Sequence, residues 1–99
     1  MGKPEGAIEN YLIRQMKAAD ALIFKFVSPS FAGVPDRIVI AKGRVVFVEV
    51  KAPGQKTRPL QDAVIARMRA HGADVRIIDT KPMVDDLRKE IESWTQPCP

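Results

Sequence analysis

The apolar residues of this chain recur at two different spacings, and the spacing changes several times along the sequence. Between residues 5 and 19 they fall three and four positions apart, which predicts an amphipathic helix. The run at 22–27 predicts a strand. Two further apolar runs, 36–41 and 45–51, flank Lys42-Gly43, a pair typical of a two-residue hairpin turn. The first half of the chain therefore predicts a helix followed by three strands.

The second half predicts one more strand between two helices. A helix should begin near Pro59, with Thr57 or Arg58 as its cap. Its apolar stripe is expected to consist of Leu60, Ala63, Val64 and Met68. Residues 75–78 predict a strand parallel to the hairpin's second strand, because a helix separates the two. A last helix should follow, so the expected order is α-β-β-β-α-β-α. This order indicates an α/β fold, a mixed sheet flanked by helices.

Length and composition fit one domain over residues 1–99, with a frayed tail at about 95–99. Sixteen basic residues against 12 acidic ones leave a net charge of +4, which suits a polyanionic partner such as nucleic acid. The single cysteine, Cys98, offers no internal disulfide. With no signal-like or membrane-spanning apolar segment, the expected location is cytoplasmic and no membrane partner is expected.

The hairpin register brings three charged residues together. If Lys42 and Gly43 form the turn, Ala41 lies opposite Arg44, and counting outward places Asp36 opposite Glu49. Two directly opposed carboxylates repel each other, and Lys51 points to the same side as Glu49 because strand side chains alternate. A divalent cation would relieve this repulsion.

This set of residues suits metal-assisted hydrolysis of a phosphodiester. Mg²⁺ prefers oxygen ligands and takes one or two carboxylates with water and substrate phosphate, a role open to Asp36 and Glu49. Lys51 would stabilise negative charge that accumulates on the phosphate. The plainer alternative is that Glu49 and Lys51 form a solvent-facing ion pair on an ordinary strand. We favour the site, because these charges interrupt a β-branched run and Asp36 faces them in register.

Three ordered motifs resemble the VRR-NUC family, the virus-type replication-repair nucleases of the PD-(D/E)xK superfamily. They are Gly33-Val34-Pro35-Asp36-Arg37, then Val46-Phe47-Val48-Glu49-Val50-Lys51-Ala52-Pro53-Gly54, and Pro59-Leu60-Gln61. The resemblance runs from Glu5 to about Leu87. It implies a restriction-endonuclease-like core, dependence on Mg²⁺ or Mn²⁺, and DNA as substrate. Small stand-alone relatives, often encoded by phages, resemble endonucleases that act on four-way junctions as homodimers. Larger relatives carry the domain in DNA-repair nucleases.

The resemblance also implies roles for individual residues. Asp36, Glu49 and Lys51 match the core motif, and Gln61 matches a glutamine that could orient a water, a metal ligand or the scissile phosphate. Glu5, on the first helix, matches a glutamate of the family and would complete the catalytic and metal-binding set. Glu9 lies one turn further on the same helical face and is the alternative ligand.

Several cations and a hydroxyl flank the expected site and are candidates for phosphate contacts. They are Lys25, Ser28, Lys56 and Arg58. Each of them alone is an ordinary surface residue, but together they indicate a DNA-binding surface beside the metal.

The sequence therefore predicts a Mg²⁺- or Mn²⁺-dependent DNA endonuclease that selects branched DNA such as four-way (Holliday) junctions. A homodimer is expected, because symmetric resolution needs two cuts and each chain carries one site. The first helix or the Trp94 region is expected to form the dimer interface. One alternative is a nickase or flap nuclease that acts as a monomer. Another is a non-catalytic, basic DNA-binding module with a vestigial metal site.

Overall fold

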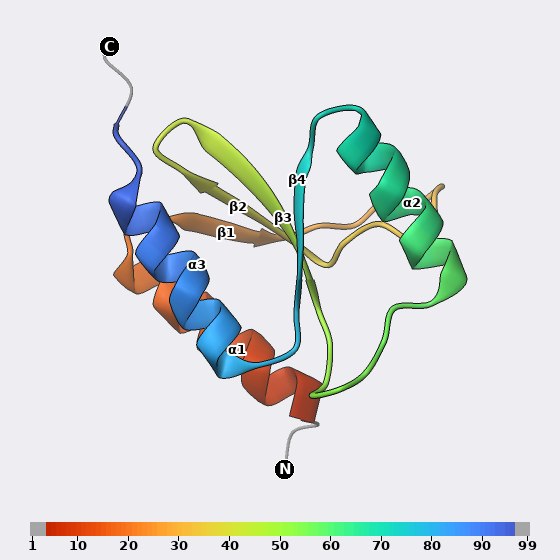
Figure 1. The fold of residues 1–99 in the computed structure, drawn as a ribbon, viewed down its shortest axis with the longest axis horizontal. Coiled ribbons are helices and arrows are strands. Elements are labelled where there is room, and N and C mark those ends of the chain that lie inside the picture. The colour runs from red at the N-terminus through yellow and green to blue at the C-terminus, as the bar shows by residue number, and fades with distance from the viewer. Residues whose placement is uncertain (1–3, 97–99) are drawn as a thin grey trace.

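A four-stranded mixed sheet organises the chain in a computed structural model that describes residues 4–96 (Figure 1). The elements are α1 (Pro4–Ala18), β1 (Leu22–Lys25), β2 (Arg37–Ala41), β3 (Arg44–Val50), α2 (Pro59–Ala70), β4 (Asp74–Ile78) and α3 (Lys81–Ser93). Their order confirms the predicted α-β-β-β-α-β-α arrangement and the α/β fold class. Most of the predicted tail at 95–99 lies outside the described residues. No helix in the described part of the chain is long and apolar enough to cross a membrane.

The predicted hairpin register is confirmed. β2 and β3 pair antiparallel, with Ala41 opposite Arg44 and Arg37 opposite Val48. Lys42 and Gly43 both have positive φ angles, 51° and 78°, as a type I′ turn requires. β4 joins β3 in parallel, as expected, and the strand order β1-β2-β3-β4 makes β3 an interior strand. The end of β3 is therefore held from both sides.

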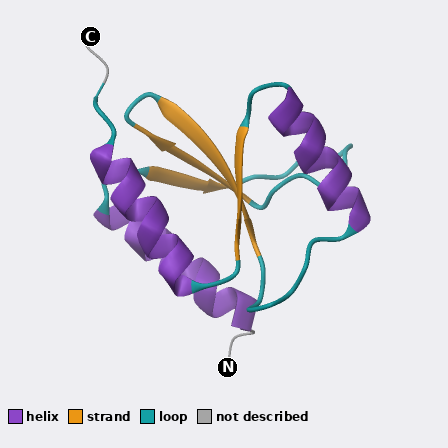
Figure 2. Cartoon of the chain, viewed as in Figure 1, coloured by secondary structure: helices purple, strands orange, loops and turns teal. Residues whose placement is uncertain are grey.

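Helices α1 and α3 lie together on one face of the sheet and build the core (Figure 2). Alternate strand residues point into this core because the strand period is two. The strands contribute Val39, Ala41, Val46, Val48, Val50 and Ile78, and the helices contribute Ile8, Leu12, Met16, Val84, Leu87 and Ile91. Tyr11 on α1 donates a hydrogen bond of 2.5 Å to Asp85 on α3.

Helix α2 lies on the other side of the sheet, next to β4 (Figure 1). It buries Val64 and Ile65, whereas Leu60 remains 55% exposed and Ala63 is also exposed. The predicted stripe is therefore wrong at Leu60 and Ala63 and lacks Ile65. The physical reason is that α2 covers only part of this face, so the stripe that it buries is narrow.

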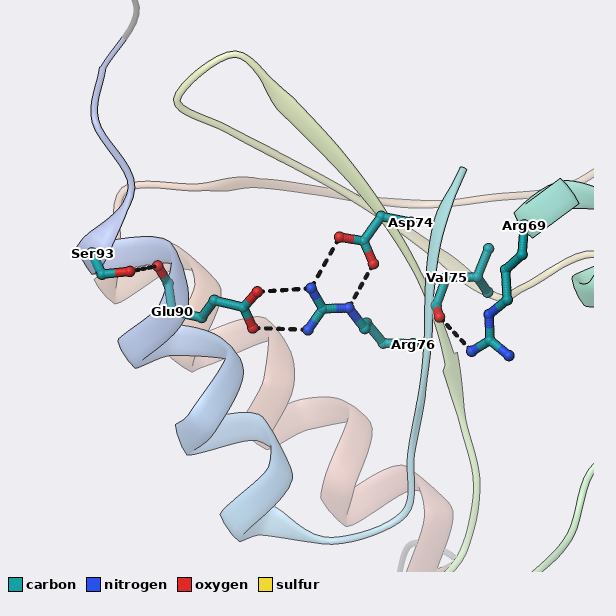
Figure 3. Close-up of polar contacts among 6 residues, drawn as sticks. All are labelled: Arg69, Asp74, Val75, Arg76, Glu90 and Ser93. Carbon is teal, nitrogen blue, oxygen red and sulfur yellow. Dashed lines mark hydrogen bonds and ion pairs between the residues drawn. The ribbon is translucent and has the colours of Figure 1, made fainter. Parts of the chain in front are cut away.

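A charged cluster joins β4 to α3 (Figure 3). The Arg76 guanidinium donates to Asp74, with a shortest distance of 2.5 Å, and to both oxygens of Glu90 at 2.8 Å. The hydrogen bond from Arg76 lowers the pKa of Glu90, and hydrogen bonds from Glu90 and Asp74 raise the pKa of Arg76. Bidentate geometry makes this cluster stronger than a simple surface pair. It fixes β4, one of the two edge strands of the sheet, to the helix layer.

Replacing Arg76 with methionine should lower the free energy of unfolding by about 1 kcal/mol, since solvent screens partly exposed pairs. The pKa of Glu90 lies below its ordinary value of 4.5 in the folded state, so this stabilisation is present above about pH 4.5 and is lost in more acidic solution. Urea unfolding at neutral and acidic pH measures both effects. Lys89→Met, an exposed substitution on α3, is the control, and equal loss in both variants would contradict the prediction.

Candidate active site

The chain approaches the end of the sheet through a tightly packed loop. Gly33 has a φ of +92°, and a Cβ at this position would lie 3.0 Å from a methyl carbon of Val64 on α2. Glycine is therefore required here both by its backbone conformation and by the closeness of α2. Pro35 is fully buried, and Asp36 follows it immediately before β2 begins. The loop thus delivers Asp36 to the end of β3, where its Oδ2 accepts a hydrogen bond of 3.3 Å from the Val50 amide.

Glu49 and Lys51 lie at the end of β3 and point to the same side. The Lys51 amide donates to the Ile78 carbonyl at 2.9 Å, so pairing with β4 continues one residue beyond the strand. The Lys51 ammonium lies 3.3 Å from Glu49 Oε2. Glu49 is only 2% exposed and Lys51 only 7%. These are buried charges rather than the solvent-facing pair of the plainer alternative.

Gln61 connects this ion pair to α2. Its side-chain carbonyl accepts a hydrogen bond of 3.0 Å from the Arg58 amide at the helix N-terminus. Its amide nitrogen therefore faces the other way and donates to Glu49 Oε2 at 3.1 Å. One side chain both caps α2 and orients the carboxylate. A glutamine in the first turn of a helix predicts the cap, but its contact with Glu49 depends on how α2 lies against β3.

The two oxygens of Glu49 have very different surroundings. Oε2 receives Lys51 and Gln61, whereas Oε1 is buried and has no hydrogen-bond partner within the described residues. The pKa of Glu49 is raised from 4.5 to about 7, because burial and the charge of Asp36 both raise it against the opposing effect of Lys51. A buried, unpaired carboxylate oxygen is costly unless something binds it. A ligand that carries positive charge would supply the partner that this oxygen lacks.

Asp36 and Glu49 together fit a hard divalent cation. They offer carboxylate oxygens, which Mg²⁺ and Mn²⁺ prefer, and their mutual repulsion would fall when a cation binds between them. In the described part of the chain, no three His, Cys, Asp or Glu side chains are grouped closely enough to hold a metal ion. The site as folded therefore supplies two protein carboxylates, and waters and substrate oxygens would complete the coordination.

The two candidate glutamates of α1 do not join this pair within residues 4–96. Glu9 accepts a hydrogen bond of 3.0 Å from Arg37, whose strand position places it on the face covered by α1. Glu5 lies half-buried one turn earlier. The sequence interpretation missed the role of Arg37. The alternation of strand side chains could have indicated this role, because it turns Arg37 away from Glu49 and toward α1.

The candidate phosphate-binding residues fall into two groups. Lys56 and Arg58 are exposed in the loop between β3 and α2, and the Arg58 amide is the group that binds the Gln61 side chain. Ser28 is half-buried in the loop that follows β1. Lys25 pairs with Arg37, so the register places it on the sheet face opposite to Glu49. The β3–α2 cations therefore follow the strand end that carries Glu49 and Lys51, whereas Lys25 lies on the other face.

Comparison with known proteins agrees with this geometry. The family model of the VRR-NUC domain matches residues 3–82. A protein named "Putative nuclease p44", from Acyrthosiphon pisum secondary endosymbiont phage 1, is 40% identical over 80 residues, which cover 80% of this chain and 86% of the phage protein. A solved structure described as a VRR_NUC domain superposes with a TM-score of 0.83 at 30% identity, covering 89% of this chain and 97% of that one. A match that spans all three motifs and the whole sheet shows that this chain belongs to the VRR-NUC family of nucleases.

Proposed function

We propose that this chain is a DNA endonuclease that depends on Mg²⁺ or Mn²⁺ and hydrolyses phosphodiester bonds in branched DNA. The observation that carries the proposal is the buried Glu49 carboxylate, which lies beside Asp36 and Lys51 and has one oxygen without a partner among residues 4–96. A purely structural carboxylate would have both oxygens satisfied. The location that we propose for this protein remains the cytoplasm.

Asp36 and Glu49 would hold the metal ion, which when bound polarises the phosphate and makes a water more acidic. The Val50 amide fixes Asp36, and Gln61 fixes Glu49, so neither carboxylate has to reorganise when the substrate arrives. This preorganisation avoids an entropic cost at the moment of reaction. Either Glu5 or Glu9 would have to move to add a third carboxylate.

Lys51 would act on the phosphate itself. Its ammonium is held near Glu49 and is largely withdrawn from water, where a positive charge stabilises a developing negative charge most effectively. The charge can also orient the attacking water. Glu49 therefore has two functions, because it both binds the cation and keeps Lys51 in place.

The basic residues beside the site support DNA as the substrate. Lys56 and Arg58 can contact phosphates on either side of the scissile bond, and Ser28 can extend the contact, whereas Lys25 on the other sheet face would contact DNA only if the strand wraps around the sheet edge. The net charge of +4 adds a sequence-independent attraction. A four-way junction is the proposed geometry, and a homodimer matches its two-fold symmetry. A monomeric nickase or flap nuclease is the second candidate.

A non-catalytic DNA-binding module is the candidate from another class. The buried Glu49–Lys51 pair argues against it, because a binding module gains nothing from burying these charges at the cost of desolvation. Cleavage assays separate the candidates directly.

Asp36→Asn and Glu49→Gln should each abolish cleavage, because each removes a carboxylate from the metal-binding pair. Cleavage of a labelled four-way junction, a flap and a linear duplex is measured with Mg²⁺, with Mn²⁺ and with a chelator. Wild type should cut only with metal and should prefer the junction. Asp86→Asn, at an exposed position on α3, is the matched control and should retain full activity. Full activity in either site variant would refute the assignment.

Glu49→Gln should also change how stability depends on pH in the metal-free protein. The pKa of Glu49 is raised in the folded state, so its protonated form is favoured and the penalty for ionisation is absent below about pH 4.5. Stability should fall as pH rises from about 4.5 to about 7, and glutamine at this position should remove that fall. Melting temperatures across this range, in chelator, measure the effect. Glu92→Gln, at an exposed site, should leave the pH profile unchanged.

Lys51→Ala should lower the rate of cleavage by on the order of 10²–10³, the usual loss for one group that stabilises transition-state charge. Its affinity for DNA should change little, because the buried ammonium contributes mainly during reaction. Lys56→Ala is the comparison variant, and it should weaken DNA binding while bound DNA is cut normally. Single-turnover kinetics and filter binding separate the two effects. The opposite pattern would make Lys51 a phosphate-binding residue.

A further inference from the structure

The sheet face opposite α1 and α3 is only partly covered. Leu22, Phe24 and Val45 on this face are 57%, 52% and 43% exposed. The strand register aligns them in two rows, because Ile40 pairs with both Leu22 and Val45, and Ile38 pairs with both Phe24 and Phe47. Phe26 extends this face, because its amide continues the pairing of β1 with the chain before β2. We call this set the open face: Leu22, Phe24, Phe26, Ile38, Ile40, Val45 and Phe47.

The open face continues into an apolar hollow. Phe26 and Phe47 contact each other at its margin with tilted rings, whose centroids are 5.3 Å apart. Beyond Phe47, a hollow of about 370 Å³ is lined by Phe31, Phe47, Val64 and Met68, together with Arg67 and His71. The surface therefore has protruding apolar side chains on β1 to β3 and a recess beside α2. Such a surface is able to receive an apolar side chain from a partner.

We propose that the open face is the docking surface for a second copy of this chain in a two-fold symmetric dimer. The inference rests on the homodimer of the proposed function and assigns its interface. In a two-fold dimer the same patch lies on both subunits, so the patch must be compatible with itself.

Charge favours a second copy over DNA as the occupant. None of the seven residues of the open face is charged. A nucleic-acid surface needs cations that pair with phosphates, and these lie instead in the loop between β3 and α2. A patch with one sign of charge would repel its own copy, whereas a neutral apolar patch does not. This matters for a chain whose net charge is +4.

The exposed area is also of a suitable size. Leu22, Phe24 and Val45 are each about half exposed and leave on the order of 100 Å² accessible apiece, so the open face presents at least roughly 300 Å² of apolar surface, a patch of the size that marks an interaction site on many monomers. A standard interface takes about 800 Å² from each partner, with an apolar centre and a polar rim. The open face would supply that centre, and the residues around it would supply the rim.

Docking here would leave the site accessible. Glu49 follows Phe47, the nearest open-face residue on β3, by two residues on the same strand face, about 7 Å at the usual rise per residue. The carboxylates therefore lie at the margin of the proposed interface and not under its centre. Two such sites on one dimer would both remain open to DNA.

The two regions that the sequence suggested for the interface, α1 and the Trp94 region, already pack their apolar side chains within the chain, which favours the open face over them. The apolar side of α1 is buried in the core through Ile8, Leu12 and Met16. Trp94 is half-buried, and the Arg44 guanidinium lies 4.7 Å from the centroid of its ring.

Sedimentation across a concentration series tests the proposal without DNA or metal. Wild type should form dimers, and higher salt should not weaken them. Phe24→Lys and Val45→Lys should each weaken association by on the order of 100-fold or more, because each places an unpaired charge in the apolar centre of the interface on both subunits. Met83→Lys is the matched control, an exposed apolar residue on α3, and it should remain dimeric. A monomeric wild type, or dimers that persist in both variants, would overturn the proposal.

Hydrogen exchange of the wild-type chain keeps the test decisive if a variant fails to fold. Peptides from β1, β2 and β3 should become protected as concentration rises. Protection confined to other elements, or protection of these strands only when DNA is added, would overturn the proposal and in the second case would indicate a nucleic-acid surface. Because neither measurement uses cleavage, loss of the dimer and loss of the nuclease are distinguishable outcomes.

Discussion

Glu49 is the residue on which the arrangement at the end of the sheet depends. It places a carboxylate in an almost fully buried position, next to a second carboxylate, and in the described part of the chain one of its oxygens has no partner. Such a group destabilises a fold unless its charge is compensated. Lys51 and Gln61 compensate one oxygen, and the raised pKa of Glu49 shows that this compensation is incomplete. A divalent cation would complete the compensation of the Glu49 charge. The same buried carboxylate would therefore both lower the stability of the metal-free protein and bind the metal in the proposed activity.

The fold holds this carboxylate in place from several directions. β3 is an interior strand, and the amide that follows it continues the pairing with β4. Gln61 connects Glu49 to α2, because its side chain both caps the helix and donates a hydrogen bond to Glu49. Gly33 allows the preceding loop to pack against α2, which brings Asp36 to the Val50 amide. The site is therefore built on strand ends and a helix N-terminus, which are positioned more rigidly than loop tips.

Local physics made much of this predictable from the sequence. The Lys42-Gly43 turn and the alternation of strand side chains determine the hairpin register, so they also determine that Asp36 approaches Glu49 and that Lys51 shares its side. A helix between two strands determines that β4 runs parallel to β3. Apolar spacing located every helix and strand within a few residues. These features depend on residues close together in the chain or on a single turn, so they can be predicted from the sequence.

Packing between distant segments decided the rest. Which face each helix covers is not encoded in its own spacing, and that choice left Leu60 exposed, buried Ile65 and exposed the open face. It also paired Glu9 with Arg37, whose side chain points toward α1, so no helix glutamate joined the carboxylate pair within residues 4–96. The burial of Glu49 and its raised pKa arise from the same packing, since desolvation is set by whatever surrounds the group. The sequence by itself determined which residues meet along the sheet. Only the tertiary structure decided which of them lose contact with water, because burial depends on the elements that pack above and below each strand.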